Sequence, residues 1–441
     1  MHNEERPESD VETSDPSRSA GVGWPARALL RIRRNIWDPP DGNLAPLDGL
    51  RGIASCMVVF YHCAVFMAFY SPQAIESGRG AWVRAITNGF WSGIDIFFVL
   101  SGFLIGRILI VDLSRDGVLY YWAFIVRRSF RIFPAYYLVT TLSLFVIAPL
   151  DLPVFAYLFR TRDWGELARG SWANYFYLVN YVNPGNEPSV LSWAWSLAVE
   201  EHFYLILPPI LWLLFRFRSD AVRIGGLVAC VALPFLGRAL QYWNDPTIEM
   251  LDGFYYYSHN RFDEIFVGVV IAYFYVLHYE ALRRFCERAG SALGLVGLSC
   301  VAAVWIFGGL TQKGAFSLVF QLIVMATGTG LVLLNGLFLD NRLTRFFANP
   351  RWYPLARISY GTYLVHPFVL FGLIHFYREW ISTGAFGVAE LVFFYLAVMG
   401  LSSLVAAALF ELLELPMLHW GARLSRESKQ RVRQRSHSKT S

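Results

Sequence analysis

Two ionisable residues, Arg51 and His62, lie in an apolar stretch that is long enough to cross a membrane. Eleven helical steps of about 100° end about 20° past three full turns, so a helix places both side chains on one face, about 16 Å apart along its axis. Ionisable groups are costly inside a bilayer and usually face a cavity or a partner. We therefore interpret the pair as candidate catalytic residues, with a neutral His62 that takes a proton from a hydroxyl group or accepts an acyl group.

The same stretch carries further polar residues at helical spacing. Asp48, Arg51, Ser55 and His62 follow one another at steps of three, four and seven, which form one helical stripe. We expect this stripe to face protein instead of lipid, with Ser55 as a residue of a substrate cavity. The alternative for His62 is a core histidine that is hydrogen-bonded to a backbone carbonyl.

A pair of carboxylates, Glu200 and Glu201, lies inside a second apolar stretch. Neighbouring helical residues point about 100° apart, so one site cannot use both equally. Ser196, Glu200 and Tyr204 repeat at four-residue steps, which favours Glu200 as the catalytic carboxylate and leaves Glu201 as a further cavity residue. Glu200 is expected to orient His62, as an acid orients a base in a triad, or to pair with the arginine of the first stretch. A purely structural buried ion pair is the alternative.

Three arginines, Arg127, Arg128 and Arg131, precede a third apolar stretch, and Pro134 follows them closely. Arg128 and Arg131 are three residues apart and so share a helical face. Guanidinium groups match phosphate oxygens with two parallel hydrogen bonds, so the cluster is a candidate binding site for a phosphate-bearing cofactor. An ordinary basic flank of a membrane span explains it equally well.

Four residues elsewhere complete the predicted substrate cavity. Ser101 lies mid-span beside Gly102, a small pair that is also typical of close helix packing. Arg261, Asp263 and Glu264 begin a later span on the outer side, where they line an entrance or form ion pairs in the interface. His366 lies at mid-depth and is followed by a proline that perturbs its helix.

The composition is that of a membrane protein. Of the 441 residues, 55% are hydrophobic and 17% are aromatic. The net charge of +5 comes from arginines at segment ends, which indicates membrane topology and not nucleic-acid binding. The five cysteines form no C-x-x-C pair, so the sequence predicts neither a disulfide framework nor a metal site.

Ten apolar stretches are long enough to span about 30 Å of hydrocarbon. They cover residues 50–70, 90–111, 132–149, 193–215, 224–243, 262–279, 291–309, 316–338, 355–376 and 387–414. Every second connection between them is rich in arginine, which by the positive-inside rule places both termini in the cytoplasm. We therefore expect an all-α polytopic membrane protein, with about ten transmembrane helices around a central polar cavity.

The chain divides into three parts on these grounds. Residues 1–43 are predicted to form a disordered acidic tail and a basic juxtamembrane segment, residues 44–415 the membrane-embedded domain, and residues 416–441 a basic cytoplasmic tail.

Five motifs, in order along the chain, resemble those of the acyltransferase-3 family of bacterial integral-membrane O-acyltransferases. They are the stretch from LDGLR (47–51) to His62, FFVLSGFLI (97–105), Arg128-x-x-Arg131 with the following Ile-Phe-Pro, SLAVEEHFY (196–204) and ISYGTYLVHP (358–367). Together they span about residues 44–415. His202 departs from the family pattern, which commonly has glutamine after the two glutamates.

The resemblance implies that a cytoplasmic acyl-CoA, usually acetyl-CoA, is the co-substrate and that no cofactor is bound permanently. It places Arg128 and Arg131 near this donor and makes Arg51 and His62 essential. The expected acceptor is a hydroxyl group of a surface polysaccharide or lipopolysaccharide sugar. Acylation of a small hydroxylated natural product such as a macrolide is the alternative within this class. A transporter or flippase for a lipid-linked sugar is the alternative of another class, since it also needs buried charges.

Overall fold

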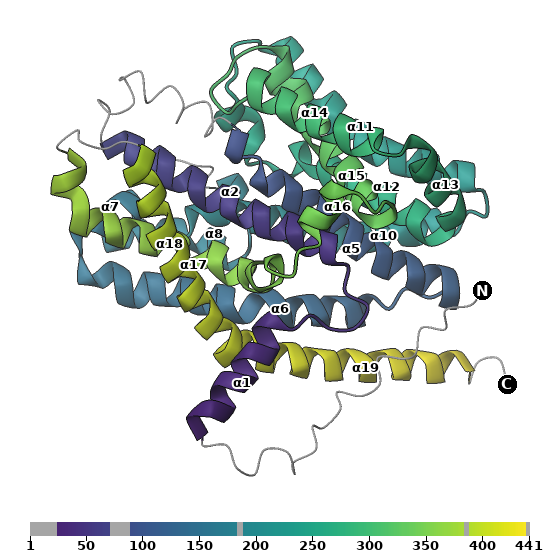
Figure 1. Ribbon diagram of the computed structural model, residues 1–441, viewed down its shortest axis with the longest axis horizontal. Coiled ribbons are helices and arrows are strands. Elements are labelled where there is room, and N and C mark those ends of the chain that lie inside the picture. The colour runs from purple at the N-terminus through teal and green to yellow at the C-terminus, as the bar shows by residue number, and fades with distance from the viewer. Residues whose placement is uncertain (1–23, 71–88, 183–187, 383–387, 438–441) are drawn as a thin grey trace.

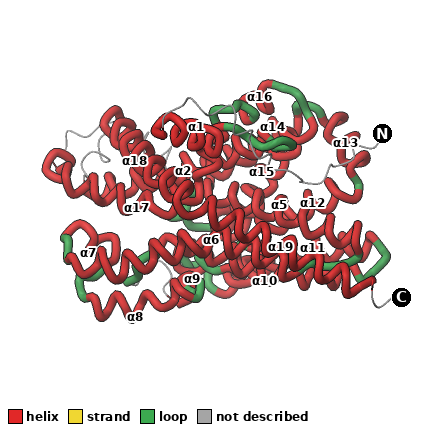
Figure 2. Tube along the Cα trace, turned by 90° about the horizontal axis from the view of Figure 1, so that it is seen from below, coloured by secondary structure: helices red, strands yellow, loops and turns green. Residues whose placement is uncertain are grey.

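The computed structural model describes residues 24–70, 89–182, 188–382 and 388–437. Within these ranges the regular structure is entirely helical and no strand is present (Figure 2). The part of the predicted acidic tail up to residue 23 lies outside the described residues. An all-α fold is therefore confirmed for the described part of the chain.

The helices differ widely in length. The long ones are α1 (Trp24–Trp37), α2 (Ala45–Tyr70), α5 (Gly93–Asp116), α6 (Tyr121–Leu142), α10 (Trp195–Phe215), α11 (Asp220–Asn244), α12 (Phe262–Leu277), α14 (Ala292–Phe307), α15 (Gln321–Phe338), α17 (Trp352–Ser382), α18 (Val388–Leu409) and α19 (Leu415–His437). The short ones are α7 (Pro153–Phe159), α8 (Trp164–Tyr175), α9 (Val179–Val182), α13 (Tyr279–Ala289) and α16 (Arg342–Phe347). Single turns of π-helix and 3₁₀-helix connect or extend several of them, among them η5 (Leu251–Tyr255).

Seven helical stretches within the described ranges are long and apolar enough to cross a membrane, or eight if the bent pair α12 and α13 forms one span. Each of the ten predicted spans contains a helix, but three of these helices are outside the seven. α12 and α14 have 16 residues each, about 24 Å of helix, and α12 turns by 111° into α13. α17 is long, but its tyrosines and histidines lower its hydropathy. The protein is thus multi-pass, and the count of about ten is not confirmed.

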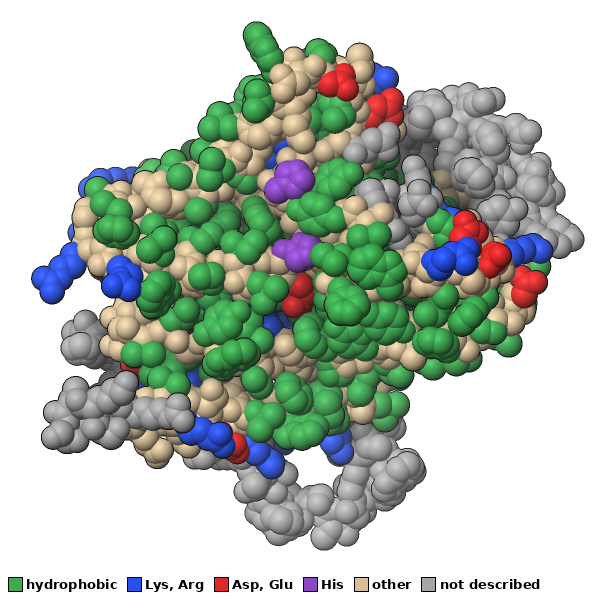
Figure 3. Space-filling model, turned by 180° about the vertical axis from the view of Figure 1, so that it is seen from behind, with side chains coloured by type: hydrophobic (Ala, Val, Ile, Leu, Met, Phe, Trp, Pro, Cys, Tyr) green, Lys and Arg blue, Asp and Glu red, His purple; other side chains and the backbone are tan. Residues whose placement is uncertain are grey.

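The surface of the helix bundle is strongly apolar. Figure 3 shows one face covered by hydrophobic side chains, with many of the Lys and Arg side chains gathered toward its margins. Large apolar residues are exposed along α10 and α11, including Leu205, Trp212, Leu213, Leu233, Leu236, Leu240 and Trp243. A soluble protein rarely exposes a patch of this kind, whereas a bilayer would cover it.

Glycines allow the central helices to approach each other closely. A Cβ atom at Gly102 on α5 would overlap the carbonyl oxygen of Ile265 on α12, and one at Gly268 would overlap the carbonyl oxygen of Val99. The close packing expected at Ser101-Gly102 is therefore confirmed. Because α5 carries residues of the site described below, this crossing fixes their positions.

We expect the variant Gly268→Ala to destabilise the protein. The added methyl group meets backbone atoms and not a flexible side chain, so α5 and α12 must separate, which costs about 3 kcal/mol. Gly237→Ala on α11 is the control, since a Cβ there meets no atom within 4 Å. Thermal unfolding in detergent measures both variants, and equal midpoints for the two would contradict the packing argument.

The basic C-terminal segment is a helix that packs along α6. In α19, the Ser425 hydroxyl donates a hydrogen bond of 2.8 Å to a backbone carbonyl of α6, and Lys429 forms an ion pair of 2.8 Å with Asp112 of α5. Arg433 pairs with Asp116 at 2.9 Å. In Figure 1, α19 extends along α6 at the lower edge of the bundle. The predicted tail is therefore held against α5 and α6 by contacts that reach Arg433.

Candidate active site

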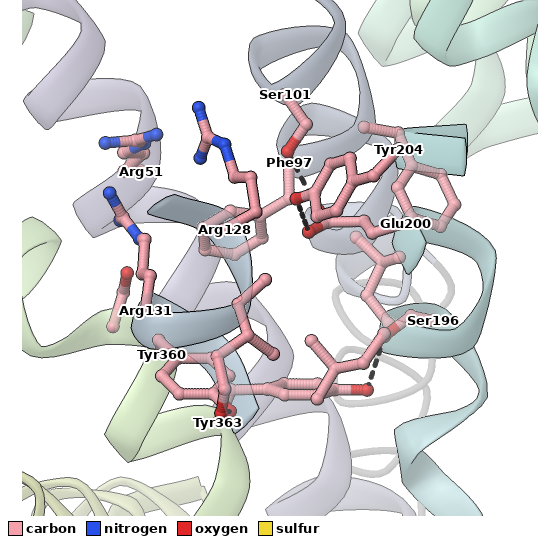
Figure 4. Close-up of a pocket in the computed structure, with 15 residues that line it drawn as sticks. Arg51, Phe97, Ser101, Arg128, Arg131, Ser196, Glu200, Tyr204, Tyr360 and Tyr363 are labelled. Atoms are coloured by element: carbon pink, nitrogen blue, oxygen red, sulfur yellow. Dashed lines mark hydrogen bonds between the residues drawn. The ribbon is translucent and has the colours of Figure 1, made fainter. Parts of the chain in front are cut away.

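Three arginines from two helices converge on one cavity, which we call the arginine cavity. Arg51 comes from α2, and Arg128 and Arg131 come from α6. The cavity has a volume of about 100 Å³. Figure 4 shows the three guanidinium groups on the same side of it. Arg131 is exposed and the other two are half-buried.

The arginine cavity is positively charged. Glu200 is its single acidic residue among the described residues that line it, against three arginines. Glu200 accepts hydrogen bonds from the Ser101 hydroxyl (2.8 Å) and from the Tyr204 hydroxyl (2.7 Å). The Arg128 guanidinium lies 5.7 Å from the centre of the Tyr204 ring. An excess of fixed positive charge suits a ligand with several negative charges.

His62 lines a second cavity of about 220 Å³, which we call the aromatic cavity. Its aromatic rings come from α2, from the residues at and just before the start of α10, from the end of η5 and the residue after it, from α17, and from one residue before α5. They are Tyr61, Phe66, Trp91, Trp193, Trp195, Tyr255, Tyr256, Tyr363 and Phe371. Arg160, after α7, also lines it. Arg51 and His62 therefore lie on one helix but line different cavities.

The two cavities share part of their walls. Ile94 of α5 and Tyr363 of α17 line both. The Tyr363 hydroxyl donates a hydrogen bond to the carbonyl of Trp193, and it is 2.7 Å from the Ser196 hydroxyl. These bonds tie α17 to the start of α10. Ile94 and Tyr363 thus form the boundary between the arginine cavity and the aromatic cavity.

The neighbour of His62 is another histidine and not Glu200. Nδ1 of His62 lies 3.0 Å from the Val58 carbonyl oxygen and 3.1 Å from Nε2 of His366. Glu200 accepts its hydrogen bonds from Ser101 and Tyr204, and among the described residues it forms neither a hydrogen bond with His62 nor an ion pair with Arg51. The expectation that Glu200 orients His62 is therefore corrected, because its carboxylate is bound by hydroxyl groups of the other cavity.

Two predicted cavity residues lie in a buried ion-pair network instead. Arg261 is bonded to Asp95 and lies 3.2 Å from Glu264, and Asp263 pairs with Arg238 at 2.5 Å. All five side chains are fully buried, and none of them lines the arginine or the aromatic cavity. Their placement corresponds to the alternative of pairing, since an unpaired buried charge would be strongly destabilising.

Some of the remaining predicted site residues line a cavity and others do not. Ser101 and Glu200 line the arginine cavity, whereas Arg127, Ser55 and Glu201 line neither cavity. His366 is fully buried behind His62. The boundary residues Ile94 and Tyr363 and the turn η5 are not among the residues predicted from the sequence. Apolar and aromatic residues are common throughout membrane spans, so their identity does not tell whether a side chain lines a cavity or packs against another helix.

Among the described residues, no three His, Cys, Asp or Glu side chains are grouped so that they could hold a metal ion. The candidate site is made of the side chains named above. Its parts are a histidine in an aromatic-lined cavity, a cationic cavity beside it and a narrow boundary between the two.

Comparisons with known proteins find relatives that are named as O-acetyltransferases. The YrhL protein of Bacillus subtilis (strain 168), provisionally named a peptidoglycan O-acetyltransferase, is 28% identical over 229 residues, which are 51% of this chain and 32% of the relative. A provisionally named O-acetyltransferase of Staphylococcus aureus (strain COL) is 24% identical over 354 residues, 75% of this chain and 51% of the relative. The peptidoglycan O-acetyltransferase OatA of Listeria monocytogenes is 30% identical over 174 residues, 37% of this chain and 24% of the relative.

These matches cover about half or less of each relative's length. No solved structure matches the chain. The model of the acyltransferase-3 family, described as an acyltransferase domain, matches residues 44–411. The chain therefore belongs to the acyltransferase-3 family.

Proposed function

We propose that the protein moves an acetyl group from acetyl-CoA to a hydroxyl group of a cell-surface carbohydrate. The observation that carries this proposal is the pair of adjoining cavities, one cationic and one aromatic with a histidine, that meet at Ile94 and Tyr363. A polyanionic donor suits the cationic cavity, and an uncharged sugar suits the aromatic one. The family and its O-acetyltransferase relatives support the reaction class.

The arginine cavity is the proposed donor site. Coenzyme A carries phosphate groups at one end and the thioester at the other, and Arg51, Arg128 and Arg131 offer guanidinium groups that bind phosphate oxygens with paired hydrogen bonds. With the phosphates there, the thioester end points to the boundary at Ile94 and Tyr363.

The aromatic cavity is the proposed acceptor site. Tryptophan and tyrosine rings present flat apolar surfaces with polar edges, which suit the faces and hydroxyl groups of a sugar ring. Two relatives are named for peptidoglycan, a carbohydrate polymer outside the plasma membrane. We therefore propose a surface polysaccharide, peptidoglycan or lipopolysaccharide sugar as acceptor.

The proposed location is the bacterial plasma membrane, with both termini and the arginine cavity on the cytoplasmic side. The basic connections of the sequence support this orientation, since the connection before α6 leads directly into Arg127, Arg128 and Arg131. Cytoplasmic acetyl-CoA then enters from one side and the sugar from the other.

In the proposed reaction, His62 acts as general base. It removes the proton of the acceptor hydroxyl while the oxygen attacks the thioester carbonyl carbon. The new C–O bond forms, the C–S bond breaks, and the CoA thiolate takes the proton from His62. The products are an O-acetyl ester and free CoA, and the histidine returns to its neutral form.

The direct test uses the purified protein in detergent. We expect it to bind acetyl-CoA in calorimetry and to transfer labelled acetyl groups from acetyl-CoA to cell-envelope glycans. A protein that binds no acetyl-CoA would contradict the proposal and favour a flippase. Label that appears in secreted small molecules, and not in envelope glycans, would contradict the carbohydrate acceptor alone.

The boundary residue Ile94 is expected to limit the acyl chain. Ile94→Ala widens the passage between the cavities and is predicted to raise kcat/KM for butyryl-CoA relative to acetyl-CoA about tenfold, because each methylene group in a tight pocket is worth about 1–3 kcal/mol. Ile96→Ala is the matched control, since Ile96 is buried on the same helix but lines neither cavity. The same selectivity in both variants would contradict this role.

A further inference from the structure

His366 is a fully buried histidine of α17 that the reaction above does not use. Both of its ring nitrogens have partners. Nδ1 lies 2.8 Å from the Tyr363 carbonyl oxygen and 3.2 Å from that of Thr362, and Nε2 lies 3.1 Å from Nδ1 of His62.

These contacts allow only one arrangement of protons for two neutral rings. Carbonyl oxygens accept but do not donate, so Nδ1 of His366 carries hydrogen and its Nε2 is an acceptor. Nδ1 of His62 then faces two acceptors, the Val58 carbonyl oxygen and Nε2 of His366, and must carry hydrogen itself. The lone pair of His62 is consequently on Nε2.

The free nitrogen is the one that the reaction needs. His62 lines the aromatic cavity, and both of its hydrogen-bond contacts to described residues are made through Nδ1. Its Nε2 is therefore available to a hydroxyl group in that cavity. A general base works only if the nitrogen that faces the substrate is unprotonated and the ring is held in position.

We propose that His366 is the positioning residue of this enzyme. Together with the Val58 carbonyl, it holds His62 in the tautomer with hydrogen on Nδ1, and its Nε2 stabilises the His62 imidazolium that forms when the acceptor hydroxyl is deprotonated. A neutral imidazole thus has the place that a carboxylate has in a Ser-His-Asp triad. The inference rests on the proposed function, in which His62 is the base.

Two substitutions of His366 separate positioning from packing. His366→Leu fills a similar volume with an apolar side chain and removes the hydrogen-bond acceptor. We expect kcat to fall about tenfold or more, and KM for acetyl-CoA to change less than about twofold. His366→Gln places a carbonyl oxygen at the same distance along the side chain as Nε2 and is expected to recover most of the lost kcat. Wild-type kcat in His366→Leu, or equal losses in both variants, would overturn the proposal.

A spectroscopic measurement gives an independent readout. In protein with ¹⁵N-labelled histidine, the His62 signals, assigned by their loss in His62→Ala, are expected to show hydrogen on Nδ1 in the wild type. The fraction of this tautomer is expected to fall in His366→Leu and to be retained in His366→Gln. A wild-type His62 with hydrogen on Nε2 would also overturn the proposal.

Failure of this inference is distinguishable from failure of the proposed function. If His62→Ala is inactive while His366→Leu is fully active, His62 remains the base and only the role of His366 is wrong. If His62→Ala is fully active, the proposed base itself is wrong, whatever His366 does.

Discussion

Replacing His62 with alanine is expected to lower kcat for acetyl transfer by about 10²- to 10⁴-fold, the contribution that a general base makes in an enzyme. The other residues of the aromatic cavity do not replace it: within the described lining, the rings and Arg160 offer no second side chain that is a base at neutral pH. Binding of acetyl-CoA is expected to change little, because His62 lines the other cavity.

The measurement is a single-turnover assay with labelled acetyl-CoA and an envelope glycan, which reports the chemical step and not product release. His375→Ala is the control, since His375 is a second histidine of α17 that lines neither cavity. Unchanged turnover in His62→Ala would show that the acceptor hydroxyl loses its proton elsewhere.

The second large effect is expected from Arg128→Gln. Removing one guanidinium group from the arginine cavity takes away charge-assisted hydrogen bonds to phosphate, each worth about 1.5–3 kcal/mol, so the Kd for acetyl-CoA should rise about 10- to 100-fold. We expect Arg128→Lys to restore only part of the affinity, because an ammonium group keeps the charge but cannot form the paired bonds of a guanidinium.

The neighbouring residue provides a matched control for charge. Arg127→Gln removes the same charge one position earlier on the same helix, but Arg127 does not line the cavity. Calorimetry with acetyl-CoA in detergent should therefore separate the two variants. An equal rise of the Kd for acetyl-CoA in both variants would mean that only the overall positive charge of the segment attracts the donor. The arginine cavity would then not be the phosphate site.

Together these variants test the division of labour between the two cavities. Arg128→Gln should act on Kd and KM for the donor, whereas His62→Ala should act on kcat. Arg51 and His62 lie on one helix, yet about 16 Å of helical rise brings them to opposite sides of the boundary at Ile94 and Tyr363. A donor whose phosphates are bound near Arg51 must therefore cross this boundary to bring its thioester to His62.

The choice between Glu200 and Glu201 shows what helical periodicity can predict and what it cannot. Four-residue steps favoured Glu200, and Glu200 is the one that lines a cavity. Periodicity gives the face of a residue on its own helix, because the rise and turn of a helix are fixed. It does not give the partner, which is why Glu200 is bonded to Ser101 and Tyr204 and not to His62.

The span count shows a second limit. Hydropathy located a helix in each of the ten expected stretches, but α12 turns by 111° into α13 and α14 has only 16 residues. Apolar composition indicates that a segment is shielded from water. A helix that is buried among other helices is shielded as well as one that crosses the lipid, so composition does not distinguish the two.

The sequence by itself determined the all-helical membrane character, the family and the residue types of the candidate chemistry, because these depend on composition, period and local motifs. Only the tertiary structure decided that Arg51 and His62 serve different cavities, that Tyr363 and Ile94 separate them, and that His366 is the neighbour of His62. His62 and His366 are 304 positions apart. Contacts across such a separation arise from how α2 and α17 pack, and no local pattern in either helix encodes the position of the other.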